Sequence, residues 1–313
     1  MDLLADWLAV AGVRGTVGAR IQASGDWGIR WNEDGDAVLY AVTSGVVWIE
    51  VEGMRPVLAG AGDVFLVTAG APHALASAPA GMPPVCESTE PSDRPIVLGT
   101  GGPATRVLAA RYRYDAGART QVLAHVPTVV HVRSGLAGDG LADTVRLLGR
   151  ELAEARPATS LVLDRLVDII LVQLLRSRLS EEDARNAPPL LRALADPVVH
   201  RALLLMHETP SRPWTAESLA RAALVSRATL ARRFDAVLAT SPSGYLTHWR
   251  MDLAAQRLRD TSDSIESIAH DVGYSSLPAF SRAFARLRDE PPGRYRESAR
   301  RDAATPSPGR RSR

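Results

Sequence analysis

The chain has 313 residues, a formal charge of +2 and a single cysteine, Cys86. This length is enough for two domains with separate cores, and one cysteine excludes an internal disulfide framework. The first residues lack the basic start and apolar run of a signal peptide, and prolines and glycines break the uncharged stretch 65–86, so we expect a cytoplasmic protein with no membrane partner.

The charge is divided unevenly between the two halves of the chain. From His200 onward there are 19 arginines against 12 acidic residues, whereas residues 1–199 hold 18 arginines and 23 acidic residues. A basic half joined to an acidic half suggests that one end of the molecule binds a polyanion and the other does not.

The first half of the chain has the sequence pattern of a β-rich domain. Residues 2–10 place their apolar side chains near one helical face, which predicts a short amphipathic helix. Short β-rich runs separated by Gly, Pro and Asp follow from residue 14 to 114. The run 46–52 alternates apolar and acidic residues toward its end, as a half-buried antiparallel strand does. Many short strands at regular spacing predict a sandwich or barrel.

Two helices are expected between the β-rich stretch and the basic half. Residues 144–156 carry one apolar stripe, whereas 161–179 is apolar over more than a single core-facing stripe. The second helix is therefore either deeply packed or a dimer-forming helix, because broad exposed apolar faces mark partner sites. The polar, proline-ended stretch 180–189 is typical of an interdomain linker, and the Arg-, Pro- and Ser-rich tail after Ser298 is expected to be disordered.

The basic half contains one pattern twice. The apolar motif at 219–223 recurs 49 positions later at 268–272, and Leu-x-Arg-x-Phe at 230–234 recurs as Phe-x-Arg-x-Phe at 280–284. This pattern is typical of a helix-turn-helix, in which an apolar helix and a tight turn precede a second helix with arginine on its outer face. Two such units on a basic segment predict DNA binding. Helices are expected at 198–208, 216–223, 227–237, 242–260, 265–271 and 277–287.

The two units are expected to present comparable surfaces. In the first, Ser226 caps the outer helix, and Leu230 and Phe234 anchor it to the core. The second unit has Ser264 as a cap and Gly273 in the turn, where a positive φ is favourable only for glycine. Eight outward side chains would then face a major groove: Arg227, Ala228, Ala231, Arg232, Leu277, Pro278, Ser281 and Arg282.

The helix expected to connect the two units, 242–260, would be about 28 Å long at 1.5 Å per residue. That length can hold two recognition helices near the ~34 Å repeat of B-DNA. Both helices would then enter successive major grooves on one face of one duplex.

Four motifs in the basic half occur together at fixed separation. They are S-R-A-T-L-A-R-R-F at 226–234, I-A-x-x-V-G-Y-x-S at 268–276, A-F-S-R-A-F at 279–284 and P-x-x-Y-R at 292–296. With them, residues 198–296 resemble the AraC/XylS family of bacterial transcription regulators, in which both recognition helices contact base edges. The resemblance implies a sequence-specific regulator whose partner is double-stranded promoter DNA, with RNA polymerase as a further partner if it activates.

A few positions depart from or constrain this pattern. Leu224 stands in the first turn, where a left-handed residue fits and a non-glycine residue costs about 1–2 kcal/mol. Near Arg288 and Asp289 the family usually has Phe-Gly. Pro278 is tolerated only in the first turn of a helix, so that helix is expected to start close to Ser276.

Direct readout of bases falls mainly to two arginines. Ala, Leu and Pro at the other outward positions offer no hydrogen bonds and would touch thymine methyl groups. Arg232 and Arg282 are each candidates for a bidentate contact with guanine. For each, the alternative is a phosphate contact or a structural ion pair, since most protein–DNA hydrogen bonds go to the backbone.

The acidic half carries motifs that are less specific than those of the basic half. They are G-D-W-G-I-R-W at 25–31, L-Y-A-V-x-S-G at 39–45, A-G-D-V-F-L-V-T-A-G-A-P-H at 61–73 and H-x-R at 131–133. With them, this half resembles the cupin-like sensor domain found ahead of AraC-type DNA-binding units. The resemblance implies a small barrel, whose mouth is a usual place for a small ligand.

Four residues are candidates for contact with such a ligand: Trp31, Tyr40, Trp48 and His73. The three aromatic residues are also ordinary barrel-core residues, which we favour, and His73 is more often a hydrogen-bonded turn residue. The His-x-His cluster of catalytic cupins is absent, and a single imidazole makes no metal site. His125 and His131 lie far along the chain from His73. No metal ligand, cofactor or catalytic residue is predicted.

The expected architecture has two domains, an N-terminal all-β cupin-like jelly-roll barrel with flanking helices and a C-terminal all-α tandem helix-turn-helix. We expect a sensor and dimerisation domain at 1–180, a linker at 181–190, a DNA-binding domain at 191–298 and a disordered basic tail at 299–313. The favoured hypothesis is a homodimeric regulator modulated by a small-molecule effector. The alternatives are a metal-dependent cupin enzyme with an accessory helical domain and a ligand-independent regulator whose barrel serves only dimerisation.

Overall fold

The computed structural model describes most of the chain. The described residues are 2–31, 37–68, 71–79, 95–101, 104–113, 126–135, 139–154, 156–180 and 189–304. Cys86, His125, residues 181–188 of the expected linker and residues 305–313 of the expected tail lie outside them.

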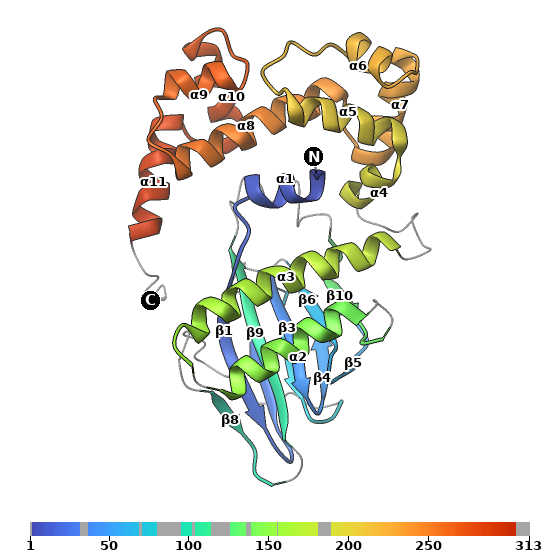
Figure 1. Cartoon of the computed structure of the whole chain (residues 1–313), viewed down its shortest axis with the longest axis vertical. Helices are drawn as coiled ribbons and strands as arrows, with labels where there is room; N and C mark the ends of the chain where they lie inside the picture. The colour runs from blue at the N-terminus through green and yellow to red at the C-terminus, as the bar shows by residue number, and fades with distance from the viewer. Residues whose placement is uncertain are drawn as a thin grey trace. The chain divides into compact units, whose positions relative to one another are not determined.

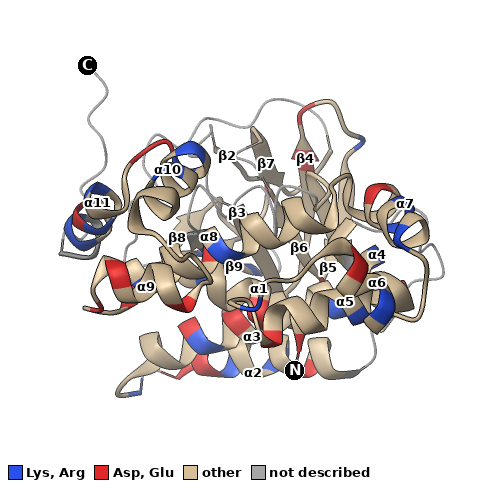
Figure 2. Ribbon diagram, turned by 90° about the horizontal axis from the view of Figure 1, so that it is seen from above, with Lys and Arg blue, Asp and Glu red and all other residues tan. Residues whose placement is uncertain are grey.

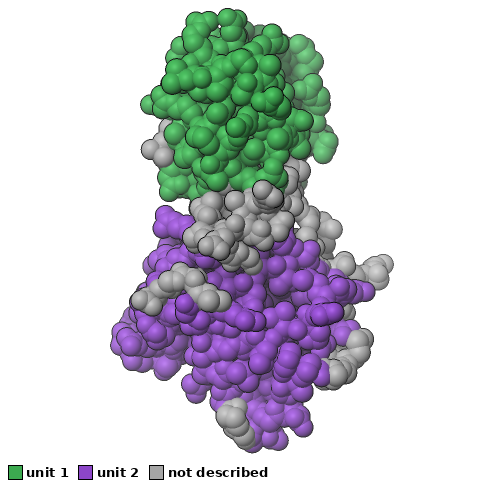
Figure 3. Space-filling model, turned by 90° about the vertical axis from the view of Figure 1, so that its right-hand side faces the viewer, with its two compact units in different colours: residues 1–13, 115–125, 183–313 green, residues 14–114, 126–182 purple. Residues whose placement is uncertain are grey.

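The chain divides into two compact units (Figure 3). Residues 14–114 and 126–182 form the first, here called the β-rich unit. Residues 1–13, 115–125 and 183–313 form the second, here called the helical unit. The first helix of the chain therefore belongs with the C-terminal helices, and the expected boundaries at 180 and 190 stay predictions.

Two sheets make up the β-rich unit (Figure 1). The six-stranded sheet has the order β10-β6-β3-β9-β1-β8 and the four-stranded sheet the order β2-β7-β4-β5. Side chains from both sheets meet in one apolar core, which confirms the predicted β-rich architecture. The strands are β1 (Arg14–Ala23), β2 (Gly28–Trp31), β3 (Ala37–Ser44), β4 (Val46–Val51), β5 (Val57–Gly60), β6 (Val64–Val67), β7 (His73–Ala76), β8 (Ile96–Leu98), β9 (Thr105–Arg113) and β10 (Val129–Val132).

Two helices, α2 (Asp139–Ala153) and α3 (Thr159–Ser180), cover one face of the six-stranded sheet (Figure 1). The acidic residues inside the apolar α3 have a structural role. Asp168 accepts a hydrogen bond from the backbone N–H of Gly15 at 2.9 Å, and Asp164 accepts one from Val17 at 3.1 Å. These bonds satisfy backbone donors on the part of β1 that has no strand partner on its second side among the described residues, because β8 pairs only with residues 21–23.

The helical unit contains nine helices among its described residues. They are α1 (Leu3–Val10), α4 (Pro189–Ala195), α5 (Pro197–Glu208), α6 (Ala216–Ala222), α7 (Arg227–Leu238), α8 (Pro242–Asp260), α9 (Ile265–Asp271), α10 (Leu277–Arg288) and α11 (Pro292–Ala304). At two places, helices extend into the segments expected as linker and tail. The helix α4 begins at Pro189, inside the expected linker, because proline suits the first helical turn. The helix α11 continues past Ser298 to Ala304, through good helix formers such as Ala and Arg.

The N-terminal helix α1 is packed against α5 and α8. Trp7 is buried, and its indole N–H donates to the hydroxyl of Tyr245 at 2.8 Å. The buried ring of His207 lies next, with Nε2 2.7 Å from that hydroxyl and Nδ1 3.1 Å from a carboxylate oxygen of Asp6. The expected amphipathic helix is therefore part of the helical unit's core.

Candidate nucleic-acid interface

The first helix-turn-helix consists of α6 and α7. Leu230 and Phe234 are fully buried, so they anchor α7 as expected. The hydroxyl of Ser226 accepts a hydrogen bond from the backbone N–H of Thr229 at 3.1 Å, which caps the helix start. The turn before it holds Leu224 in the left-handed region, with φ 58°, and the residue is 92% exposed. The strain expected at this position is present.

The second helix-turn-helix consists of α9 and α10. Phe280 and Phe284 are fully buried, and Ser276 caps α10 through the backbone N–H of Ala279 at 3.3 Å. Pro278 therefore lies in the first helical turn, as predicted. Gly273 takes φ 89° in the turn, where an added Cβ would come within 2.7 Å of the carbonyl oxygen of Ser211. Glycine is required there by both conformation and space.

The helix α8 holds the two helix-turn-helix units in one body, because it contacts α7 on one side and α9, α10 and α11 on the other (Figure 1). Its 19 residues correspond to about 28 Å at 1.5 Å per residue. Asp252 of α8 is paired with Arg288 of α10, and both side chains are buried. A rigid spacer with a buried ionic contact limits the freedom of one recognition helix relative to the other.

Seven of the eight predicted DNA-contacting residues are exposed, and Ser281 is half-buried. The structure places the first four on α7 and the other four on α10, and Figure 2 shows arginines along both helices. Among the described residues, Arg227, Arg232 and Arg282 have no hydrogen-bond or ion-pair partner. By contrast, Arg233 of α7 is bound to Asp196 at 2.8 Å. Within the residues that the structure describes, a structural ion pair therefore does not occupy the three predicted arginines.

One basic residue on this surface was missed by the sequence analysis. Arg286 lies four positions after Arg282 and is likewise exposed on α10. Residues four apart share a helix face, so this spacing was the signal that could have found it. Arg286 and Arg288 also lie close enough to His248 of α8 to lower its pKa, together with burial, which is the largest cause.

The β-rich unit brings three of the four ligand candidates together. Nδ1 of His73 is 2.7 Å from the carbonyl oxygen of Ala71, which can only accept, so Nδ1 carries the proton and Nε2 accepts from the Tyr40 hydroxyl at 2.5 Å. Trp31 stacks on His73 with ring centroids 5.7 Å apart. Burial lowers the pKa of His73 and raises that of Tyr40. The cluster is therefore neutral and largely closed on itself.

Trp48 does not join this cluster. Its strand neighbours Val47 and Ile49 are buried in the core between the sheets, and side chains alternate along a strand. Trp48 therefore faces the outer side of the four-stranded sheet, where it is opposite Leu58 in the register.

Within the described residues, no group of three His, Cys, Asp or Glu side chains is placed to hold a metal ion. His131, one of the histidines considered from the sequence, is instead bound to Asp63 at 3.2 Å. In the same part of the chain, no helix has the length and apolar content needed to cross a membrane.

Two family models match the chain. Residues 2–180 match a model described as Cupin, and residues 219–298 match one described as Helix-turn-helix domain. An AraC-like transcription regulator of Streptomyces lividans is 35% identical over 311 residues, covering 95% of this chain and 98% of the relative. One from Streptomyces antibioticus is 33% identical over 303 residues, covering 95% and 99%.

A transcriptional regulator with an AraC-type DNA-binding domain from Chromobacterium violaceum is 32% identical, with a TM-score of 0.34, and covers 37% of this chain and 99% of that one.

Proposed function

We propose that a small ligand held by the β-rich unit controls the action of this chain at promoters. The chain belongs to the AraC family of helix-turn-helix transcriptional regulators, and it carries an N-terminal cupin domain. The chain binds DNA through its helix-turn-helix domain. Its relatives are transcription regulators and not enzymes, so the alternative of a cupin enzyme is not supported.

The observation that carries the DNA-binding model is the pair of capped, core-anchored helices that expose arginines with no partner in the described part of the chain. Arg232 of α7 and Arg282 of α10 project from helices whose opposite faces are fixed by buried Phe234 and Phe284. A side chain held on a rigid helix can place a guanidinium against guanine with little further ordering. We infer that these two arginines read bases and that Arg227 and Arg286 contact phosphates.

A homodimer is the assembly that the β-rich unit supports best. On α3, Leu161, Val162 and Ile169 are exposed, and Leu147 on α2 is exposed as well. Val162 and Ile169 are seven positions apart, hence on one helix face. Monomers rarely expose several large aliphatic residues on one face without a partner. A second copy of the chain would cover this face and place two DNA-binding units on one promoter.

Ligand control requires that the effector binds one conformation more tightly than another. Trp31, Tyr40 and His73 remain the barrel-interior candidates, although their mutual contacts are those of a packed core. The domain limits at 180 and 190, the cytoplasmic location and, for an activator, contact with RNA polymerase stay part of this proposal.

Genomic footprinting with the full chain tests the central claim. We expect protection of discrete promoter sites, each with sequence blocks about one helical turn apart. No preference for any promoter over random oligonucleotides would overturn the DNA-reading model. Thermal-shift screening then tests ligand control, since a ligand that binds the folded state raises its stability. Sequence-specific binding without any stabilising metabolite would favour the ligand-independent alternative.

A further inference from the structure

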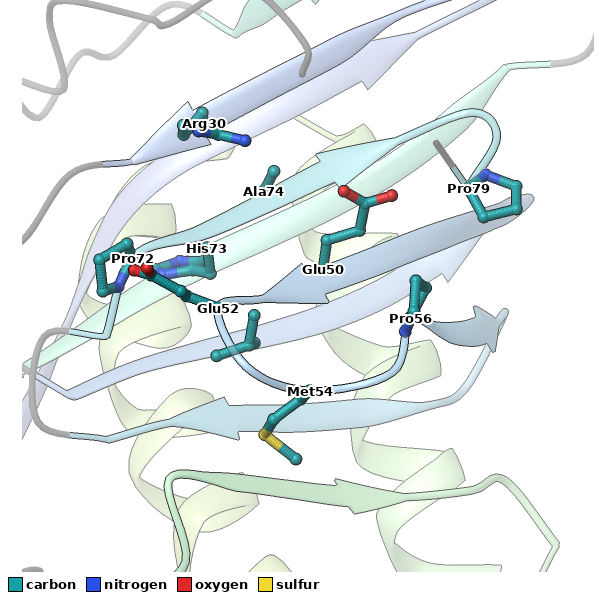
Figure 4. A pocket seen from close by; sticks show the side chains of 10 residues that line it. Arg30, Glu50, Glu52, Met54, Pro56, Pro72, His73, Ala74 and Pro79 are labelled. Carbon is teal, nitrogen blue, oxygen red and sulfur yellow. The ribbon is translucent and has the colours of Figure 1, made fainter. Parts of the chain in front are cut away.

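A cavity of about 480 Å³ opens on the outer face of the four-stranded sheet (Figure 4). Arg30 on β2, Ala74 on β7 and Glu50 on β4 lie in one row of the strand register. Their neighbours one position earlier or later along each strand are buried in the core between the sheets, so these three side chains face outward. Ala74, between the two charged residues in this row, adds only a methyl group to the lining.

The next outward row extends the cavity. The backbone N–H of Glu52 donates to the carbonyl oxygen of Pro72 at 3.2 Å, which holds the two segments together. Met54 and Pro56, from the turn between β4 and β5, line one side with apolar atoms, and Pro79 lines another (Figure 4). The wall therefore combines carboxylates with an apolar surface.

The described residues that line the cavity carry an excess of negative charge. Glu50 and Glu52 contribute two carboxylates against the single guanidinium of Arg30. His73 also lines the cavity, but burial lowers its pKa, and its two ring nitrogens are engaged by Ala71 and Tyr40. It therefore adds no positive charge near neutral pH.

We propose that this cavity, here called the outer cavity, binds a small organic cation with an apolar body. The cationic group would lie against Glu52, and the body would cover Met54 and the prolines. The volume falls within the ~300–1,000 Å³ typical of small-molecule sites. As an effector site, the outer cavity rests on the ligand control proposed above; as a binding site, it rests on this geometry alone.

Other occupants fit the lining less well. An anion would meet two carboxylates and one guanidinium, so its net interaction would be repulsive. A metal ion needs several converging ligands, and no group of three suitable side chains exists among the described residues. A neutral molecule would gain the apolar contact without the charge attraction.

The test uses three probes of equal length and different charge: 4-phenylbutylammonium, 4-phenylbutanol and 4-phenylbutyrate. Calorimetric titration of the full chain is expected to show tightest binding for the ammonium and weakest for the carboxylate. Glu52→Gln should weaken the ammonium about two- to fivefold, as expected for loss of one exposed charge contact, and leave the alcohol unchanged. The control is Glu208→Gln, at an exposed residue that ends α5 in the helical unit.

Equal binding of the three probes, absence of binding, or equal effects of Glu52→Gln and Glu208→Gln would overturn the outer cavity as a cation site. Promoter affinity measured with and without the ammonium separates the two proposals. Charge-selective binding that leaves promoter affinity unchanged supports the site and counts against ligand control through it.

Discussion

Arg232 and Arg282 occupy matching positions on α7 and α10, and each lacks a partner among the described residues. The sequence left open whether they are paired within the protein, contact phosphates or read bases. The structure removes the first option for the described part of the chain. Binding measurements with DNA can distinguish the two remaining options, phosphate contact and base readout.

We expect Arg232→Ala and Arg282→Ala each to weaken promoter binding by about 1–3 kcal/mol and to relax preference at one base position. Fluorescence anisotropy on the promoter site and its single-base variants measures both effects. The control is Arg221→Ala on α6, whose guanidinium is paired with Glu217 at 3.2 Å. A uniform loss across all sequences with a shallower salt dependence would assign the arginines to phosphates.

Leu224 and Gly273 occupy equivalent positions in the turns of the two helix-turn-helix units. Both residues adopt a positive φ, but only Gly273 does so without steric cost. Leu224 is 92% exposed, so removing its side chain sacrifices little packing. We expect Leu224→Gly to raise the free energy of unfolding of the helical unit by about 1 kcal/mol.

Denaturant unfolding of the full chain, monitored by far-ultraviolet circular dichroism, measures this effect. The control is Ala223→Gly, one residue earlier, where φ is −88° and glycine offers no relief. That change should lower stability by about 0.5–1 kcal/mol. Destabilisation by both glycines would show that Leu224 contributes a contact rather than strain.

At the scale of elements, α1 depends on a directional hydrogen-bond chain. The Trp7 indole can only donate to Tyr245, so the Tyr245 hydroxyl donates onward to Nε2 of His207, and Nδ1–H of His207 donates to Asp6. Protonation of Nε2 would place a second donor against the Tyr245 oxygen. Burial accordingly lowers the pKa of His207 from 6.5 to about 3.

This shift makes the helical unit sensitive to mild acid. A histidine whose folded-state pKa lies below its unfolded value contributes its full stability above the unfolded pKa and loses it as the pH falls. We therefore expect stability to drop between pH 6.5 and 5 by about 2 kcal/mol, at about 1.4 kcal/mol per pH unit. Urea unfolding of the full chain at pH 7 and pH 5 measures the loss.

His207→Gln should remove this pH dependence, because an amide can keep one donor and one acceptor in the same chain. His270→Gln is the control, since the side chain of His270 is 86% exposed. If the His207→Gln protein loses stability over this range as the parent does, the hydrogen-bond chain is not the cause.

At the scale of the whole molecule, the proposed dimerisation through α3 would decide how many DNA-binding units act together. We expect Ile169→Asp to shift the protein to monomers in analytical ultracentrifugation, because it places a charge in the centre of the aliphatic face. Promoter affinity should fall at least about 100-fold, since linked binding is lost. The control is Val97→Asp on β8, an exposed aliphatic residue away from this face. An unchanged dimer would move the interface elsewhere.

Sequence patterns alone were sufficient for the fold class, the tandem helix-turn-helix and seven of its eight predicted outward residues. Helix periodicity, serine caps and paired phenylalanines act within a few neighbouring residues, so they can be read from spacing. The same local rules located the strained turn at Leu224 and the start of α10 beside Pro278.

Contacts between distant residues needed the tertiary structure. The hydrogen-bond chain Trp7–Tyr245–His207–Asp6 joins positions over 200 residues apart. Nothing in the local sequence of α1 indicates that this helix belongs to the helical unit. Likewise, strand alternation indicates that Arg30 and Glu50 face outward, but only the strand order places β2, β7 and β4 side by side and thereby forms the outer cavity. Local spacing sets secondary structure, whereas cavities and buried networks arise when packing brings remote segments together.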